Sequence, residues 1–179
     1  MNILKLAALA GTAGLICSAA SADPTLPLQK PGLWQQTMSQ DGNANPNATS
    51  QICLDTAAEQ KMTATGTEMS AKHCQSRHVA RTAGGWSIDS VCSLGQGWTT
   101  KSHATVTGDF TTKVATTIDS TTTGAPTPQM NGTHSLVMSA TWLGPCKPGQ
   151  RGGDVVMGNG MKMNLLDEQP APPPGGMQH

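Results

Sequence analysis

Aromatic and charged residues are scarce in this sequence. Of its 179 residues none is Tyr, one is Phe and four are Trp, and 12% are charged. A nucleic-acid-binding protein needs a basic surface to displace counterions from phosphates, whereas the 11 Lys and Arg here are balanced by 11 Asp and Glu. The composition therefore predicts no nucleic-acid partner. It also leaves a core of aliphatic, Met and Trp side chains that needs covalent support.

Hydrophobic runs long enough to cross a membrane are missing too. The apolar stretch Leu6–Ile16 covers roughly 11 residues, short of the ~20 that a helix needs to span a bilayer. It follows Lys5 and precedes the small residues Ala20-Ser21-Ala22, an order typical of a signal peptide. We therefore expect residues 1–22 to be a signal peptide cleaved near Ala22, and the mature protein to be exported without a permanent membrane anchor.

The cysteines are not spaced as zinc ligands, because the sequence has no Cys-x-x-Cys pair. Beyond the signal peptide there are four, Cys53, Cys74, Cys92 and Cys146, and an even number in an exported chain predicts two disulfides. Four cysteines allow three pairings. We expect Cys53–Cys74 and Cys92–Cys146, since the first interval encloses one helical segment and the second a run of strands.

What the sequence does contain is a series of short segments with strand character, separated by Gly-, Asn- and Pro-rich turns. They are residues 30–41, 48–54, 75–81, 86–92, 98–107, 110–122 and 134–143. Threonine makes up eleven of the 25 residues from 99 to 123, and its branched side chain favours extended backbone with one wetted face. The prediction is a mainly β fold, an antiparallel meander of about seven strands in a curved sheet or partial barrel.

Three further segments complete the expected organisation. Residues 154–157 and 161–166 can add a hairpin at the sheet edge. Residues 168–179 are rich in Pro and Gly and are expected to be a disordered tail, so that residues 23–167 form a single β-rich domain. One helical insertion is expected at about 55–72, where Asp55 is a candidate N-cap; Gly66 leaves open one helix with a break or two short helices.

Alternation within the strands places several large apolar side chains on one concave face. The candidate face for an apolar ligand consists of Trp34, Trp86, Trp98, Phe110 and Trp142. Either the helix around Met62 and Met69 plugs this face and makes an ordinary core, or it leaves a cleft for an apolar molecule. We expect a ligand to be apolar, because no charged residues converge on this face.

Catalytic motifs are also lacking. There is no Gly-x-Ser-x-Gly nucleophile elbow, the acidic residues are scattered, and His103 and His134 lie on separate predicted strands where they could meet across the sheet. We therefore expect a non-enzymatic protein without a cofactor, with an uncharacterised hydrolase as one alternative. A second alternative is copper handling, because the thioethers of Met157, Met161 and Met163 are soft ligands for Cu(I).

Several landmarks together resemble one family, the exported bacterial proteins known as domain of unknown function 3617. They are Lys30-Pro31-Gly32-Leu33-Trp34, Gln51-x-Cys53-Leu54-Asp55 with Cys74, Asp89-Ser90-Val91-Cys92, Gly108-Asp109-Phe110 and Trp142-Leu143-Gly144-Pro145-Cys146. The resemblance covers about residues 30–166; Gln35 stands where the family usually has Glu. It implies a small periplasmic, β-rich, disulfide-bonded domain without an established activity. We expect a periplasmic binding or accessory domain, whose partner is an apolar ligand or another periplasmic protein.

Overall fold

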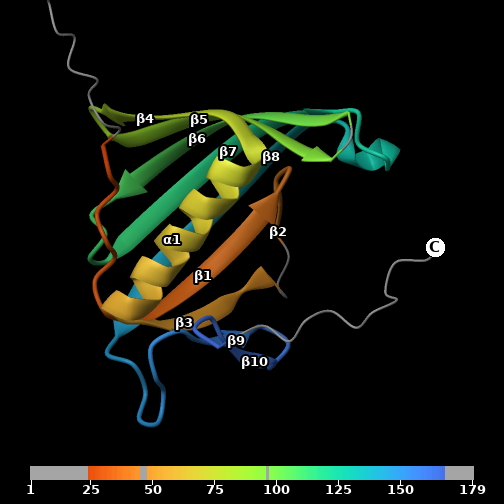
Figure 1. The fold of residues 1–179 in the computed structure, drawn as a ribbon. Helices are drawn as coiled ribbons and strands as arrows, with labels where there is room; N and C mark the ends of the chain where they lie inside the picture. The colour runs from red at the N-terminus through yellow and green to blue at the C-terminus, as the bar shows by residue number, and fades with distance from the viewer. Residues whose placement is uncertain (1–23, 45–47, 96, 168–179) are drawn as a thin grey trace, which may run out of the picture.

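The computed structural model describes residues 24–44, 48–95 and 97–167. These residues form ten strands and one α-helix (Figure 1). The strands are β1 (Gly32–Gln40), β2 (Asn43–Ala44), β3 (Ser50–Leu54), β4 (Cys74–Thr82), β5 (Gly85–Gly95), β6 (Trp98–Gly108), β7 (Lys113–Thr123), β8 (Gly132–Gly144), β9 (Asp154–Met157) and β10 (Lys162–Asn164); the helix is α1 (Thr56–His73). The expected signal peptide and C-terminal tail lie outside the described residues.

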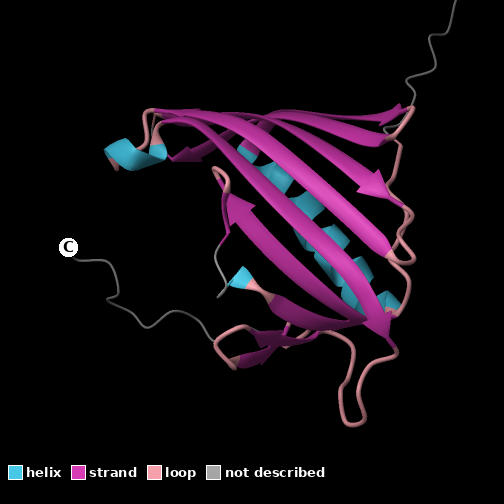
Figure 2. Cartoon of the chain, turned by 180° about the vertical axis from the view of Figure 1, so that it is seen from behind, coloured by secondary structure: helices cyan, strands magenta, loops and turns pink. Residues whose placement is uncertain are grey.

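All strands belong to one antiparallel sheet that is not closed. Strands β4 to β8 are neighbours in chain order, β1 lies beside β8, and β3, β9 and β10 follow, while the short β2 pairs with β1. Short connections force successive strands to run in opposite directions, which explains the meander. The sheet curls strongly, so that its edge strands β4 and β10 approach the same side of the molecule (Figures 1 and 2).

The predicted fold class is confirmed, with ten strands in place of about seven. The three others are the two-residue β2, which was not expected, and β9 and β10, which form the edge hairpin expected from residues 154–157 and 161–166. One boundary is also different: β7 begins at Lys113, whereas the sequence predicted a strand from Phe110. The reason is local, because Phe110 has a φ of 59° and lies in the turn before the strand.

The two faces of the sheet differ in polarity. Cross-strand register places Trp34 opposite Trp142, and Ala140 opposite Val114. We call the face that carries these side chains the inner face. Threonine and serine side chains occupy most of the alternate positions of the central strands and form the outer face. This alternation gives the sheet one apolar and one wetted side, as the Thr-rich sequence predicted.

Helix α1 is a single uninterrupted helix. Asp55 caps it, with the carboxylate accepting from the Ala58 amide at 2.8 Å, and Gly66 does not break it. The helix connects β3 to β4, which lie towards opposite edges of the sheet, so it spans the opening between them. Ala58 is its one buried residue. The helix is therefore held mainly by its two ends.

The predicted pairing of the cysteines is wrong, although all four form disulfides. Cys53 is bonded to Cys146 and Cys74 to Cys92. Cys74 and Cys92 are direct cross-strand partners on β4 and β5. Towards the other edge, Cys53 is the next-to-last residue of β3 and lies opposite Leu33. Leu33 in turn lies opposite Gly144, so the chain just beyond β8 reaches Cys53. The insertion of β1 between β3 and β8 produces this pairing.

Non-reducing peptide mapping should find Cys53 linked to Cys146 and Cys74 linked to Cys92. Replacing Cys53 and Cys146 by Ser should destabilise the protein more than replacing Cys74 and Cys92, because the sequence separations are 93 and 18 residues. Loop-closure entropy gives about 4.7 and about 3.2 kcal/mol for the two bridges. Urea unfolding of the two double variants measures the difference, and a Cys53–Cys74 peptide would contradict the structure.

Candidate functional site

The inner face is not filled by the helix that crosses it. Met62 and Met69 lie on the same side of α1 as Ala58 by helical spacing, the side that meets the sheet. Their side chains nevertheless remain 38% and 54% exposed. A tightly packed helix would bury both, since it would use such a stripe as its core face. The helix therefore leaves part of the inner face uncovered, and we call the concave inner side of β1, β7 and β8 the inner groove.

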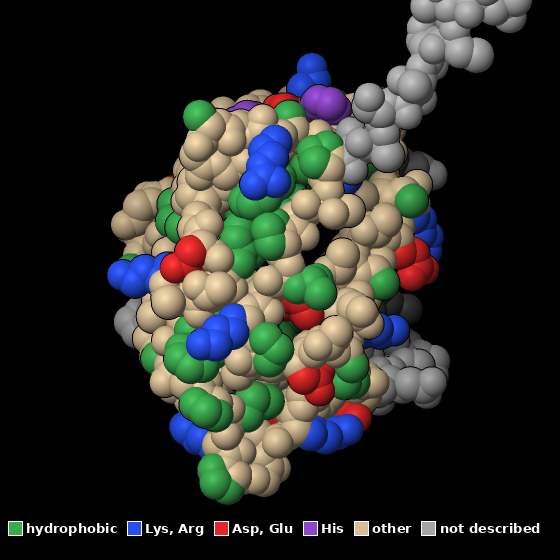
Figure 3. Space-filling model, turned by 90° about the vertical axis from the view of Figure 1, so that its left-hand side faces the viewer, with side chains coloured by type: hydrophobic (Ala, Val, Ile, Leu, Met, Phe, Trp, Pro, Cys, Tyr) green, Lys and Arg blue, Asp and Glu red, His purple; other side chains and the backbone are tan. Residues whose placement is uncertain are grey.

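One end of the inner groove is closed by aromatic side chains. Trp34, Trp86 and Phe110 are buried, and the rings of Trp86 and Phe110 meet edge to face with centroids 5.2 Å apart. Trp142 is half-buried beside them, with the ammonium of Lys30 3.6 Å from its ring centroid. On the surface of this side of the molecule, hydrophobic side chains lie in several patches among Lys, Arg, Asp and Glu side chains (Figure 3). Four of the five aromatic residues predicted to form the ligand face thus build the closed end.

The turn before β7 holds Phe110 in this closed end. The Asp109 carboxylate accepts from the amides of Thr111, Thr112 and Lys113 at 2.8, 2.6 and 3.1 Å, and from the Thr112 hydroxyl at 2.6 Å. These donors, led by the Thr112 hydroxyl and amide, hold the pKa of Asp109 far below its usual value of 3.8. The turn places Phe110 at positive φ and directs its ring into the core.

Beyond the aromatic cluster the groove contains a cavity of about 200 Å³. Its lining comes chiefly from the inner-face positions of β1, β7 and β8, with contributions from the ends of two loops. The lining is mixed: its apolar residues are Met38, Ala48, Val114, Met138 and Ala140, and its uncharged polar residues are Gln29, Gln36, Thr37, Ser50, Thr116 and Ser139. Among the described residues that line it none is charged. A cavity of this size and lining can hold a short apolar segment of a ligand.

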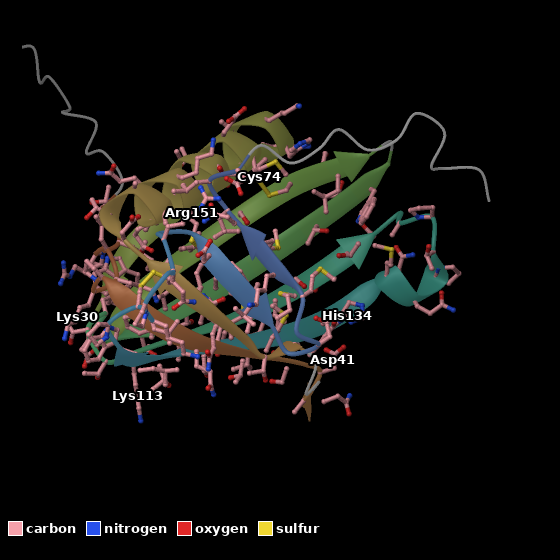
Figure 4. The ribbon with its side chains drawn as sticks, turned by 90° about the horizontal axis from the view of Figure 1, so that it is seen from below. Lys30, Asp41, Cys74, Lys113, His134 and Arg151 are labelled. Atoms are coloured by element: carbon pink, nitrogen blue, oxygen red, sulfur yellow. A yellow bond between two sulfur atoms is a disulfide. The ribbon has the colours of Figure 1, made fainter. Side chains whose placement is uncertain are left out.

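A second hollow lies at the opposite end of the groove. It has a volume of about 310 Å³ and is lined by Gln40, Ser120, Gln129, Met130, His134 and Leu136. Asp41 and His134 lie side by side at this end, far from Lys30 and Lys113 at the closed end (Figure 4). The imidazole Nδ1 of His134 is 3.1 Å from the Asp41 carboxylate. Sequence analysis did not connect these two residues, which are 93 positions apart.

The Asp41 carboxylate is fixed by two donors. The Ser135 amide donates to Oδ1 at 2.8 Å, and together with the His134 ring it lowers the pKa of Asp41 below its usual value. An ionised carboxylate accepts only, so the neutral imidazole carries its proton on Nδ1 and keeps a lone pair on Nε2. That Nε2 atom is buried and has no hydrogen-bond partner among the described residues. This acceptor is therefore enclosed by the protein and unsatisfied among the described residues.

Ser120, His134 and Asp41 resemble a catalytic triad in composition but not in contacts. Ser120 is the cross-strand partner of His134, yet its hydroxyl donates to the main-chain carbonyl of His134 at 3.3 Å. The hydrogen bond from a nucleophile to the base Nε2, which the chemistry requires, is not present. Both residues lie within strands whose amides belong to the sheet ladder, which leaves little backbone for an oxyanion hole. As these side chains lie, they do not make the contacts of an acyl-transfer triad.

The remaining histidine considered from the sequence lies elsewhere. His103 points from β6 to the outer face, where its ring is 2.7 Å from the Asp89 carboxylate, so it does not meet His134 across the sheet. Both side chains of this outer pair are more than half exposed. Solvent screens such a pair, and it contributes little to stability.

The other predicted site residues do not converge. Trp98 is half-buried at the start of β6. Met157 packs against the core from β9, whereas Met161 is 58% exposed in the following turn and Met163 is 36% exposed on β10. Within the described part of the chain no group of three or more His, Cys, Asp and Glu side chains is arranged to hold a metal ion. Nor is any described helix both long and apolar enough to span a bilayer.

Fold and site together define a class: an open, curved antiparallel sheet, bridged by one helix and cross-linked by two disulfides, with a groove along its inner face. The chain matches the family model described as "Protein of unknown function (DUF3617)" over residues 29–146. It therefore belongs to that family, as its landmarks indicated. Searches of curated proteins and of solved structures found no match.

We expect Asp109→Ala to lower the melting temperature by opening the turn that seats Phe110. Folding lowers the pKa of Asp109 below the unfolded value of 3.8. The stability that the ionised carboxylate adds to the folded protein is therefore complete above pH 3.8 and is lost as the pH falls towards the lowered pKa. The difference in melting temperature between wild type and variant should therefore be largest at pH 5 to 7 and shrink below pH 4. Circular dichroism melts measure it. Asp119→Ala, on the outer face, is the control, and a difference that does not change with pH would contradict the assignment.

Proposed function

We propose that this protein is a non-enzymatic binding module that holds a small apolar ligand in its inner groove. The observation that carries the proposal is the incomplete cover of the inner face: Met62 and Met69 of α1 remain exposed, and β1, β7 and β8 line a cavity of about 200 Å³. A chain with few large apolar residues would gain by burying them against one another. A concave cavity lined by apolar side chains and a few uncharged polar groups is typical of a small-molecule site.

The lining of the cavity supports a ligand that is apolar and variable in shape. Met38 and Met138 are cross-strand partners beside Ala140 and Val114. Methionine side chains are flexible and polarizable, so they adapt to different apolar surfaces. The absence of charge among the described lining residues disfavours an ionic ligand within the cavity, because an unpaired charge there would lose its hydration.

Two observations support a binding role over catalysis in an exported protein. The four cysteines of the domain are oxidised, which removes the thiol nucleophiles and fits an oxidising compartment such as the periplasm. In addition, the hydroxyl of Ser120 is directed to a main-chain carbonyl and not to the imidazole of His134. We therefore propose an accessory or carrier role after export.

Titration with N-phenyl-1-naphthylamine, a probe that fluoresces in apolar surroundings, should give a saturable signal with one site per chain. Thr116→Trp should weaken binding at least about tenfold, because the indole fills a cavity whose apolar contacts supply the affinity. Thr117→Trp places the same side chain on the outer face of β7 and should leave binding unchanged.

Circular dichroism should show that both variants fold, and Ser50→Leu offers a milder filling of the same cavity. Equal affinities of Thr116→Trp and Thr117→Trp, or no saturable signal in the wild type, would contradict the cavity as the site. Turnover of para-nitrophenyl esters that Ser120→Ala abolishes would contradict the non-enzymatic assignment.

A further inference from the structure

Gln36 is a polar residue among the inner-face side chains that line the cavity. It lies on β1 between the buried Trp34 and Met38, and its cross-strand partners are Ser50 on β3 and Ala140 on β8. Side chains directly opposite one another in a sheet start about 5 Å apart, and both of these partners are short. The longer side chain of Gln36 therefore extends past its cross-strand neighbours towards the cavity.

The carboxamide of Gln36 is open and without a partner. Gln36 is half-buried, and its amide group makes no hydrogen bond to another described residue. Unlike Nε2 of His134, its nitrogen and oxygen are not among the described polar atoms that the protein encloses without a partner. The same holds for the hydroxyls of Ser50 and Thr116, which line the same cavity. A molecule in the cavity can therefore bind to these groups.

The lining restricts the charge and the polar group of the ligand. None of the described lining residues is charged, so a charged ligand group would lose its hydration there without gaining a counter-charge. A carboxamide offers an N–H donor and a C=O acceptor side by side. A ligand with only one complementary group leaves the other atom of Gln36 unpaired. An uncharged amide whose N–H lies beside its C=O pairs with both atoms at once.

The apolar part of the lining fits a hydrocarbon substituent. Met38 follows Gln36 by two residues on β1 and is the cross-strand partner of Met138. Val114 and Ala140, which are also cross-strand partners, line the cavity beside them. The cavity thus places an open carboxamide within largely apolar surroundings. A few placed polar groups within an apolar lining are what gives a small-molecule site its specificity.

We propose that the ligand is a small uncharged amide with a hydrocarbon substituent, a primary amide or a lactam, which Gln36 binds through two hydrogen bonds. The Nε2–H group of Gln36 donates to the ligand carbonyl, and its Oε1 atom accepts from the ligand N–H. This inference rests on the proposed function, because the ligand must occupy the inner groove to reach Gln36. It adds the chemical class of the ligand and the residue that determines specificity.

Hexanamide, heptan-2-one and 2-methylhept-1-ene are matched probes, because they share one shape and can form two, one and no hydrogen bonds with Gln36. Displacement of N-phenyl-1-naphthylamine, calibrated separately for each variant, gives their affinities. Gln36→Met keeps the length of the side chain and removes both polar atoms. It should weaken the binding of hexanamide about 5- to 30-fold and that of heptan-2-one less, and it should leave 2-methylhept-1-ene unaffected.

Gln35→Met is the matched control, since Gln35 is the neighbouring glutamine on the outer face and its replacement should leave all three affinities unchanged. Nitrogen-15 spectra of the wild type provide a readout that needs no variant. The side-chain amide protons of Gln36 should move downfield on addition of hexanamide, and much less on addition of 2-methylhept-1-ene.

The outcomes separate this inference from the proposed function. If no probe displaces the dye, the proposed function itself fails. The groove binds apolar ligands but the recognition by Gln36 is overturned if Gln36→Met weakens all three probes equally, or if the Gln36 amide signals do not respond to hexanamide. Tighter binding of hexanoate than of hexanamide to the wild type would also overturn it.

Discussion

An apolar sheet face must be covered, and this chain has one helix with few apolar side chains to cover it. Helix α1 presents small residues and two methionines towards the inner face, and it is buried only at Ala58, close to β3. Its C-terminal end runs directly into β4, where Cys74 is bonded to Cys92. The helix is thus held across the opening of the sheet without packing along its length. The groove is a direct consequence of this tethering.

The rest of the domain supports that arrangement by closing one end. Trp34, Trp86 and Phe110 concentrate the aromatic content of a Tyr-free chain in a single cluster. The disulfide from Cys53 to Cys146 ties the end of β3 to the chain beyond β8 at the same end. A small chain can keep a cavity only if its remaining contacts compensate for the lost packing.

Local patterns in the sequence predicted much of the fold. Alternation in residues 134–143 correctly placed Leu136, Met138, Ala140 and Trp142 on one face, and Asp55 was correctly identified as an N-cap. The sequence also predicted the family, because its landmarks are short motifs, and the presence of two disulfides, because the number of cysteines is even and export is expected. These properties depend on neighbours within a few residues, which a sequence displays directly.

Long-range properties were not predictable in the same way. The cysteine pairing and the contact between Asp41 and His134 both depend on β1 lying beside β8, a choice that no local pattern encodes. Phe110 fits a strand by composition, but the four hydrogen bonds to Asp109 turn the chain there. The sequence therefore predicted the type of site, an apolar concave face of the sheet. Only the three-dimensional structure shows where on that face the cavity lies.

The central claim, that the inner groove holds an apolar chain, is tested most directly by nuclear magnetic resonance of methionine methyl groups. In protein labelled with carbon-13 at these methyls, saturating decan-1-ol should shift the signals of Met38 and Met138, which line the cavity. The signals of Met161 and Met163 in the terminal hairpin should not move. Shifts confined to the hairpin methionines, or no shift at Met38 and Met138, would contradict the account.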